Sequence, residues 1–408
     1  MKSLSFKNEY IFFLPLLLIY VLICLIKQQN ILVGDEDDYL LYADNLTNGF
    51  YADPSHEYSY LWNGPGYPLV LAFFKILNFP LLIPKLLNTL FIYLGIVYVF
   101  KTLKQFINKK TSFIFALALG LYYPLLVQSI PKLLTEALSF FLVSLFTYSV
   151  FSYINKKSKK HKWISISTLG YLVLTKIIFA YVIFGTLIMV LPLFYYRRFF
   201  SSAKSFCLIL VLGFSLTIPY LMYTFKLTNK LFYYGNSGGM SLYWMSTPFE
   251  NEFGDWHSFE TLKEKPYIYK NHKNFIETIK NLPPIEKDIA LKKKALYNIK
   301  NNKFKFFKNW LSNIGRLFFD YPHDIQKIDY KFFIYLIPKL IIFIILLFNS
   351  IFIFFNFRKL NPIILFLNIF LLVYLGGLSL LSSYSRFLNI VLPIIFVCIT
   401  YTFKKSIK

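Results

Sequence analysis

The stretch that decides the fold is YIFFLPLLLIYVLICLI at residues 10–26, which the acidic segment GDEDDYLLYADNLTNG follows at residues 34–49. Residues 10–26 carry no charged side chain, and a helix of this length matches the roughly 30 Å hydrocarbon core of a bilayer. A second long apolar run, residues 332–357, contains one charge, Lys339. A helix in a soluble protein needs only one apolar stripe, so such continuous runs indicate membrane spans.

The composition supports the same class. Apolar residues make up 56% of the chain, charged residues 16%, and the mean hydropathy is +0.51. These values exclude a soluble enzyme and predict an all-α, polytopic transmembrane protein with juxtamembrane helices in its outer-face loops. The net charge of +24 invites a nucleic-acid partner, but the basic residues cluster beside the ends of apolar runs, so we expect none. Cys24, Cys207 and Cys398 lie within apolar runs and predict small buried thiols.

Short basic loops predict the topology, because Lys and Arg collect in short cytoplasmic loops. Four such loops, at 101–110, 156–162, 197–204 and 358–359, and the tail FKKSIK can all lie inside if both termini are cytoplasmic. About ten spans then alternate across the membrane. They are expected at residues 10–27, 84–104, 112–129, 134–154, 163–176, 178–196, 203–225, 332–357, 361–381 and 386–403.

These spans divide the chain into three parts. An N-terminal transmembrane module (1–225) contains the first outer loop (28–83), an outer-face loop or cap covers 226–331, and C-terminal transmembrane helices follow at 332–408. Within the first outer loop, residues 66–79 are apolar but short, and they predict an interfacial or re-entrant helix.

Two segments of the second outer loop also carry a pattern. Residues 286–319 mix Lys with large apolar side chains and predict an amphipathic helix on anionic headgroups. GNSGG (235–239) lacks the Lys-Ser/Thr pair of a phosphate loop and predicts a turn. In GDWH (254–257) we expect a buried Trp256 beside a surface His257, with a contact of this pair with the acceptor as the alternative.

Ionisable residues gather at one predicted depth. Asp35 and Glu36 follow the first span, Glu136 opens the fourth, Lys176 closes the fifth and Arg386 opens the tenth. An ionisable group in a membrane helix costs about 3 kcal/mol on insertion scales. Each residue alone has a structural explanation, since Lys side chains snorkel and helical neighbours form ion pairs. Two acidic groups from separate loops and two cations from different helices together favour a substrate that is anionic and attached to lipid.

These residues lie in motifs that resemble the membrane glycosyltransferases of the C-type (GT-C) fold. The nearest resemblance is to the bacterial relatives of protein O-mannosyltransferases and of the galacturonosyl- and aminoarabinosyltransferases of lipopolysaccharide. Pro219-Tyr220 and Phe225-Lys226 depart from the Pro-Trp and Arg-Asn of these relatives, and Asn63-Gly64-Pro65 departs from the Lys-Pro-Pro of some. The matching segments are GDEDDYLLYADNLTNG (34–49), NGPGYPLVLAFFKIL (63–77), LYYPLLVQSIPKLLTEALSFFLVSL (121–145), LGYLVLTKIIF (169–179), IPYLMYTFKLTNKLFYYGNSGGMSLYWMSTP (218–248) and GDW (254–256).

The resemblance implies a glycosyltransferase in the bacterial inner membrane. It would move a monosaccharide from a polyprenyl-phosphate donor to an acceptor hydroxyl on the outer face, by direct displacement with inversion. Catalytic roles are implied for Asp35 as general base, for Glu36 in orienting the acceptor or supporting Asp35, and for Glu136 as a second acidic group. Lys176 and Arg386 are the expected ligands of the donor phosphate.

The resemblance leaves other features open. Tyr39, Asn63 and Tyr67 are expected to shape the pocket. Some relatives need a divalent metal ion and others do not; if one is used, Asp35 and Glu136 would hold it. The expected partners are the lipid-linked donor, membrane lipids, and a lipid, glycan or protein acceptor.

Two other functions remain as alternatives. A lipid-sugar flippase or transporter would place its charges near the bilayer midplane and often shows a repeat between halves, whereas here the charges gather at the outer rim. A surface-polysaccharide polymerase would carry its key basic residues in outer loops, without an acidic pair after the first span.

Overall fold

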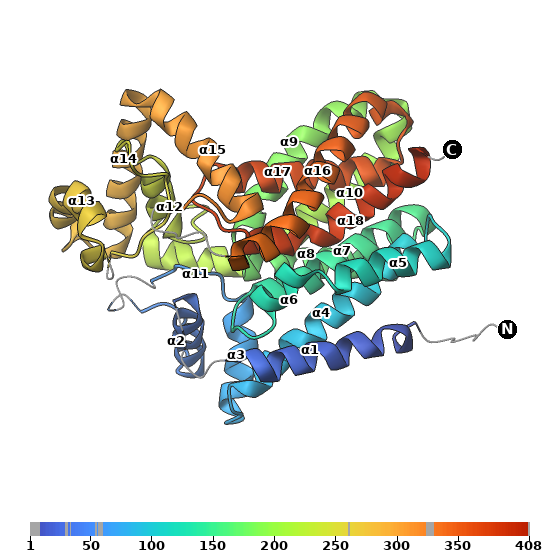
Figure 1. Ribbon diagram of the computed structural model, residues 1–408, viewed down its shortest axis with the longest axis horizontal. Helices are drawn as coiled ribbons and strands as arrows, with labels where there is room; N and C mark the ends of the chain where they lie inside the picture. Colours follow the sequence, from blue (N-terminus) through green and yellow to red (C-terminus); the bar gives the residue numbers. More distant parts are fainter. Residues whose placement is uncertain are drawn as a thin grey trace.

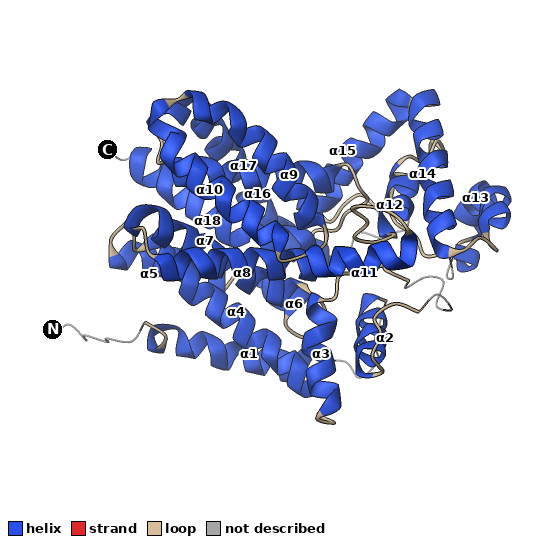
Figure 2. Ribbon diagram, turned by 180° about the vertical axis from the view of Figure 1, so that it is seen from behind, coloured by secondary structure: helices blue, strands red, loops and turns tan. Residues whose placement is uncertain are grey.

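The computed structural model describes residues 9–28, 32, 34–53, 55, 60–259, 262–323 and 330–406. In these ranges the regular elements are α-helices and short 3-10 turns, with no strand (Figure 2), so the all-α prediction is confirmed. Cys24 and Cys398 are buried and Cys207 is partly buried, as free thiols.

Long apolar helices lie side by side and form a bundle (Figure 1). Seven helices of the described chain are long and apolar enough to cross a membrane, or eight if the pair α5 and α6, bent by 48°, counts as one span. Two other predicted spans correspond to the shorter helices α1 (Leu14–Lys27) and α8 (Lys159–Thr175), so length and composition alone do not reproduce the count of ten. The others are α4 (Leu82–Leu103), α5 (Lys109–Gly120), α6 (Tyr123–Ser129), α7 (Glu136–Lys156), α9 (Ile178–Val190), α10 (Arg197–Ser215), α16 (Tyr330–Asn356), α17 (Pro362–Ser379) and α18 (Arg386–Ser406).

The predicted span 203–225 has the wrong bounds. Helix α10 ends at Ser215, and α11 (Ile218–Thr228) follows as a separate helix. Pro219 lies in the first turn of α11, where its missing N–H is tolerated, whereas inside one continuous helix it would remove a hydrogen bond. At the other end α10 begins at Arg197, so the residues predicted as a basic loop form its first turns.

The two ends of the bundle differ. Helix α1 begins and α18 ends at one end, whereas α2 (Asp35–Thr47) and the helices α12 to α14 lie at the other (Figure 1). Helices α12 (Ser237–Met245), α13 (Pro266–Ile279), α14 (Pro284–Asn301) and α15 (Lys303–Phe319) form what we call the cap. The cap has its own small apolar core, which consists of Met240, Tyr243, Trp244, Leu262, Ile268, Ile279 and Leu291.

The amphipathic helix predicted at 286–319 is two helices, α14 and α15, that meet at an angle (Figure 1). Asn302 separates them with a non-helical backbone (φ −132°), and its side chain donates a hydrogen bond to the carbonyl of Asn298. Asn side chains compete for backbone groups in this way and so favour helix ends, which periodicity alone does not reveal.

Helix α3 (Gly66–Ile76) packs against α2 and α8 and supports the loop that precedes it. A Cβ on Gly64 would lie 2.1 Å from the carbonyl oxygen of Leu174, and one on Gly66 would lie 2.5 Å from Oγ1 of Thr175. Both glycines are therefore required for this close approach to α8. The contact places residues 60–65 beside the junction between α8 and α9.

Candidate active site

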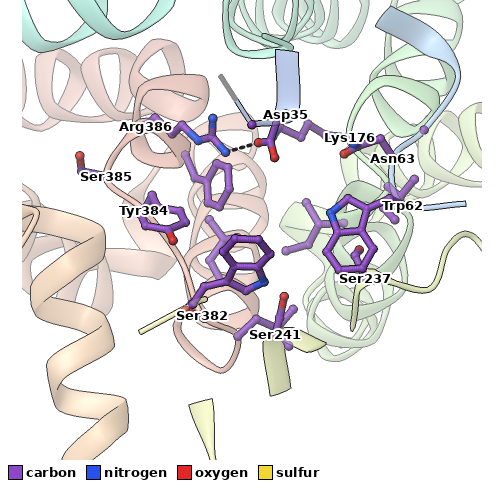
Figure 3. Close-up of a pocket in the computed structure, with 18 of the residues that line it drawn as sticks. Asp35, Trp62, Asn63, Lys176, Ser237, Ser241, Ser382, Tyr384, Ser385 and Arg386 are labelled. Carbon is purple, nitrogen blue, oxygen red and sulfur yellow. Dashed lines mark hydrogen bonds and ion pairs between the residues drawn. The ribbon is translucent and has the colours of Figure 1, made fainter. Parts of the chain in front are cut away.

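A pocket of about 470 Å³ lies where α2, the α8–α9 junction, the cap and the loop between α17 and α18 meet (Figure 3). Asp35 and Arg386 line it from opposite ends of the chain, and Lys176 lines it from the α8–α9 junction. Ser237 and Trp256 line it from the cap. Segments that are far apart in the sequence thus share one cavity.

Four of the predicted residues meet at this pocket and form what we call the charged centre. Arg386 donates a hydrogen bond to Asp35 Oδ2 within an ion pair (Figure 3). Arg386 Nε lies 3.6 Å from Glu136 Oε1, and Lys176 Nζ donates to the same oxygen at 3.4 Å. Two carboxylates and two cations from four elements therefore alternate in one chain of contacts.

The members of the charged centre differ in how deeply their side chains are buried. The side chain of Glu136 is 1% exposed, whereas those of Lys176, Arg386 and Asp35 are 17%, 24% and 32% exposed. Glu136 therefore lies beneath the two cations and orients them, and its Oε2 has no hydrogen-bond partner in the described chain. The open faces of Lys176 and Arg386 remain accessible to an anion in the pocket.

Asp35 is held ionised at the start of α2. Gly34 precedes it with φ +63°, a conformation that favours glycine, so the chain can turn directly into the helix. Burial raises the pKa of Asp35, but the charge and hydrogen bond of Arg386 outweigh burial, so this pKa lies below its ordinary value. Asp35 is thus a carboxylate that faces the pocket.

Glu36 has a different environment from Asp35. Its side chain is buried, and Oε1 accepts a hydrogen bond of 2.7 Å from the backbone N–H of Leu133. Glu36 does not line the pocket. The contact ties α2 to the turn that leads into Glu136, so Glu36 joins two elements of the site.

Lys176 is placed by the break between α8 and α9. Its backbone is extended (φ −133°, ψ 99°), so α8 ends at Thr175 and α9 begins at Ile178. The ammonium lies 4.4 Å from the centre of the Phe387 ring, a cation–π contact with α18. Lys176 therefore contacts both α7 and α18.

The three predicted pocket residues lie next to one another. Tyr39 and Asn63 line the pocket, and the Tyr39 hydroxyl donates to Asn63 Oδ1 at 3.2 Å. Tyr67 is buried behind them, with its ring edge-to-face with Tyr39 at 5.5 Å between centroids. Tyr67 therefore supports the wall without lining it.

Several lining residues were not predicted. Trp256 is partly exposed and lines the pocket while His257 is buried, so the expected arrangement of this pair is wrong. Asp320, at the end of α15, also lines it and accepts a hydrogen bond from Ser385 at 3.2 Å. Trp62 lines the pocket beside Asn63. The GDW motif was the only sequence signal for these contacts.

The residues present do not fit a resident divalent metal ion. The described ranges contain no group of three or more His, Cys, Asp or Glu side chains placed to hold one. The two carboxylates considered for this role, Asp35 and Glu136, are already paired with Arg386 and Lys176. An ion bound between the carboxylates would lie against two positive charges.

Comparison with known proteins gives a fold but no sequence relative. No family model and no curated protein matches the chain. Among solved structures, the archaeal oligosaccharyltransferase AglB from Archaeoglobus fulgidus, in complex with an inhibitory peptide and a dolichol-phosphate, matches with a TM-score of 0.51 and 14% identity. The match covers 98% of this chain and 51% of that one, so the chain spans about half the length of AglB.

A second solved structure is ArnT from Cupriavidus metallidurans bound to undecaprenyl phosphate, at a TM-score of 0.44 and 11% identity, covering 96% of this chain and 76% of that one. The likeness to AglB shows that the chain has the fold of the C-type membrane proteins, as the motifs predict.

Proposed function

We propose that this chain, a polytopic helical protein of the C-type fold, is a membrane glycosyltransferase that moves a monosaccharide from a polyprenyl-phosphate donor to an acceptor hydroxyl. The observation that carries the proposal is the charged centre, in which one carboxylate and two cations open into the same pocket. The dolichol-phosphate in the AglB complex supports a lipid-phosphate donor for a chain of this fold.

The reaction needs a base, and Asp35 provides it. The acceptor oxygen attacks the anomeric carbon while its proton passes to the Asp35 carboxylate. The bond between the anomeric carbon and the lipid-phosphate oxygen breaks, and its electron pair stays on the phosphate. One direct displacement inverts the anomeric centre. Proton transfer to a positioned base contributes roughly 10² to 10⁴ in rate.

The reaction also needs cations, because negative charge grows on the departing phosphate. Arg386 can hold two phosphate oxygens at once, and Lys176 adds a point charge from the other side. When Arg386 turns to the phosphate, Asp35 loses the partner that holds its pKa low. Donor binding would therefore make Asp35 a stronger base at the step that needs one.

The remaining predicted residues take positioning roles. Glu136 lies under the two cations and fixes their spacing. Glu36 anchors α2 to the backbone at Leu133, which sets the position of Asp35. Tyr39 and Asn63 form the wall beside the sugar.

We place the pocket at the outer face of a bacterial inner membrane. It lies at the end of the bundle that carries α2 and the cap (Figure 1), whereas α1 begins and α18 ends at the opposite end, which we assign to the cytoplasm. In this arrangement 1–225 supplies most of the catalytic module, 226–331 covers the acceptor side, and 332–408 contributes Arg386.

The test is turnover by the purified chain in lipid nanodiscs. The assay follows release of polyprenyl phosphate from a radiolabelled polyprenyl-phosphate hexose, with a cell-envelope extract as the acceptor source. Asp35→Asn should reduce release by roughly 10² to 10⁴. Asp37→Asn, an exposed neighbour on α2, should leave it unchanged. Full turnover by Asp35→Asn would refute the assignment, and a flippase would still move its lipid after either change.

A further inference from the structure

The pocket has a second end whose side chains are aromatic or carry hydroxyl groups. Figure 3 shows Trp62, Ser237, Ser241 and Ser382 on the far side of the cavity from Asp35 and Arg386. We call Trp62, Trp256, Ser237, Ser241 and Ser382 the aromatic subsite; all five line the pocket and none bears a charge.

Trp62 is held by a rigid backbone. The backbone N–H of Trp62 donates to the hydroxyl of Tyr42 at 2.8 Å, and the Tyr42 ring stacks on Tyr51 at 4.7 Å between centroids. The neighbouring carbonyl of Leu61 accepts a hydrogen bond of 3.0 Å from the N–H of Asn236, at the start of α12. The loop that carries Trp62 is therefore fixed both to α2 and to the cap.

Trp256 is held by a separate buried cluster. The backbone N–H of Trp256 donates to Asp255 Oδ1 at 2.9 Å, and Asp255 Oδ2 accepts from His323 Nδ1 at 2.9 Å. The guanidinium of Arg316, which is fully buried, donates to the carbonyls of Phe253 and Gly254 at 2.8 and 2.9 Å. A buried Arg–Asp–His cluster thus fixes the turn that presents Trp256.

The two indoles remain only partly buried despite this support. Their ring centroids lie 6.4 Å apart in an edge-to-face arrangement, and both rings line the cavity. A purely structural tryptophan would gain more by full burial, because stabilisation grows with the apolar area removed from water. Two independent clusters that hold two rings at one cavity indicate a binding surface.

The polar atoms of this end also lack partners. Ser382 Oγ and Asn63 Nδ2 are buried without a hydrogen bond in the described chain. Ser237 and Ser241, one helical turn apart on α12, both face the cavity, and their hydroxyls make no hydrogen bond within the described residues. The two buried atoms and the two partly exposed hydroxyls can all pair with a ligand that carries hydroxyl groups.

From these observations we propose that the aromatic subsite binds the acceptor and that the acceptor is a carbohydrate. A pyranose ring presents a C–H face that packs on an indole and hydroxyls that pair with serine and amide groups. The assignment of the sugar to the acceptor rests on the proposed function of the same pocket.

Direct binding tests the subsite without turnover. Saturation-transfer NMR on the full chain in nanodiscs would use chitotriose, maltotriose and a Ser/Thr hexapeptide as probes. We expect transfer to the ring protons of at least one trisaccharide, weakened roughly 2- to 12-fold per ring by Trp62→Leu or Trp256→Leu. Trp163→Leu, at an exposed indole on α8 outside the pocket, is the matched control.

Trp256→Tyr retains a ring and should keep most of the binding, which separates a lost contact from a misfolded loop. Failure of both trisaccharides to bind the wild type, binding equal in all variants, or binding of the peptide alone would overturn the proposal.

Steady-state kinetics then distinguish whether the aromatic subsite binds the acceptor or the sugar of the lipid-linked donor. Trp256→Leu should raise KM for the acceptor and leave KM for the lipid-linked donor unchanged. A higher donor KM with an unchanged acceptor KM would mean that the rings hold the donor sugar, which overturns the assignment. If the wild type binds glycans but turns over no lipid-linked sugar, the proposed function fails while the carbohydrate subsite stands.

Discussion

Arg386 and Asp35 are separated by 351 positions in the chain and form an ion pair inside the pocket. The same guanidinium approaches Glu136 through Nε, so one side chain of α18 contacts carboxylates of α2 and α7. The charged centre therefore exists only when the C-terminal helices are packed against the N-terminal ones.

The first prediction concerns the geometry of Arg386. Arg386→Lys keeps the charge but cannot reach Asp35 and Glu136 with separate nitrogens. We expect Arg386→Ala to lower the transfer rate roughly 10²- to 10³-fold, and Arg386→Lys to fall between it and the wild type. Turnover in nanodiscs measures this, with the unfolding temperature as a check on folding.

Arg198→Lys is the matched control, because within the described residues Arg198 donates to the backbone carbonyls of Arg358 and Leu360, which lie outside the pocket. A wild-type rate for Arg386→Lys would show that only the positive charge is required. It would contradict the prediction that Arg386 must contact Asp35 and Glu136 through separate nitrogens.

The second prediction separates Glu36 from Asp35. Glu36→Gln keeps an oxygen that can accept from the N–H of Leu133, so we expect nearly wild-type turnover. Glu36→Ala leaves that buried N–H unpaired and should cost about 1–3 kcal/mol of unfolding free energy. Thermal unfolding and turnover, measured on the same samples, test this separation of the roles of Glu36 and Asp35. A large rate loss in Glu36→Gln with unchanged stability would instead support a chemical role for Glu36.

The charged centre could be predicted because ionisable groups are rare in apolar helices and therefore stand out. Glu136, Lys176 and Arg386 were found in this way, and Asp35 was found from the acidic segment that follows the first span. Glu36 could not be separated from Asp35 by residue type, because both are carboxylic acids, although consecutive helical residues point about 100° apart. Only the packing of α2 decides which of the two faces the cavity.

The aromatic subsite could not be predicted from the sequence, for a different reason. Trp62 lies outside the matching segments, and the GDW motif that contains Trp256 does not reveal which of its side chains faces a pocket. Their position depends on tertiary contacts, those of Tyr42 with one loop and those of Arg316 and His323 with the other. The broken helix at Asn302 was missed similarly, because the apolar period continues across the break.

The third prediction is that transfer does not need a divalent metal ion. Arg386 and Lys176 occupy the positions beside Asp35 and Glu136 where an ion would bind, and they supply the positive charge for the phosphate. Turnover should therefore be the same in EDTA as in Mg²⁺ or Mn²⁺. A tenfold or greater loss of turnover in EDTA, restored by Mn²⁺, would contradict the prediction. It would indicate that Asp35 and Glu136 are metal ligands.

The fourth prediction uses His323, which supports Trp256 through Asp255. Burial lowers the pKa of His323, but Asp255 and Asp320 outweigh it and raise the pKa from 6.5 to about 9. A raised pKa means that folding favours the charged form of the imidazole. The stabilisation is therefore complete below pH 6.5 and is lost as pH rises through about 9.

The unfolding temperature of the wild type should therefore fall by a few degrees between pH 6.5 and 9, relative to that of His323→Gln. Taking the difference between the two proteins cancels the titration of thiols and tyrosines that they share. His161→Gln, far along α8 from the cap, should keep the wild-type pH profile. If His323→Gln and the wild type showed parallel profiles, His323 would be neutral in the folded protein, and the ion pair with Asp255 would not hold the turn at Trp256.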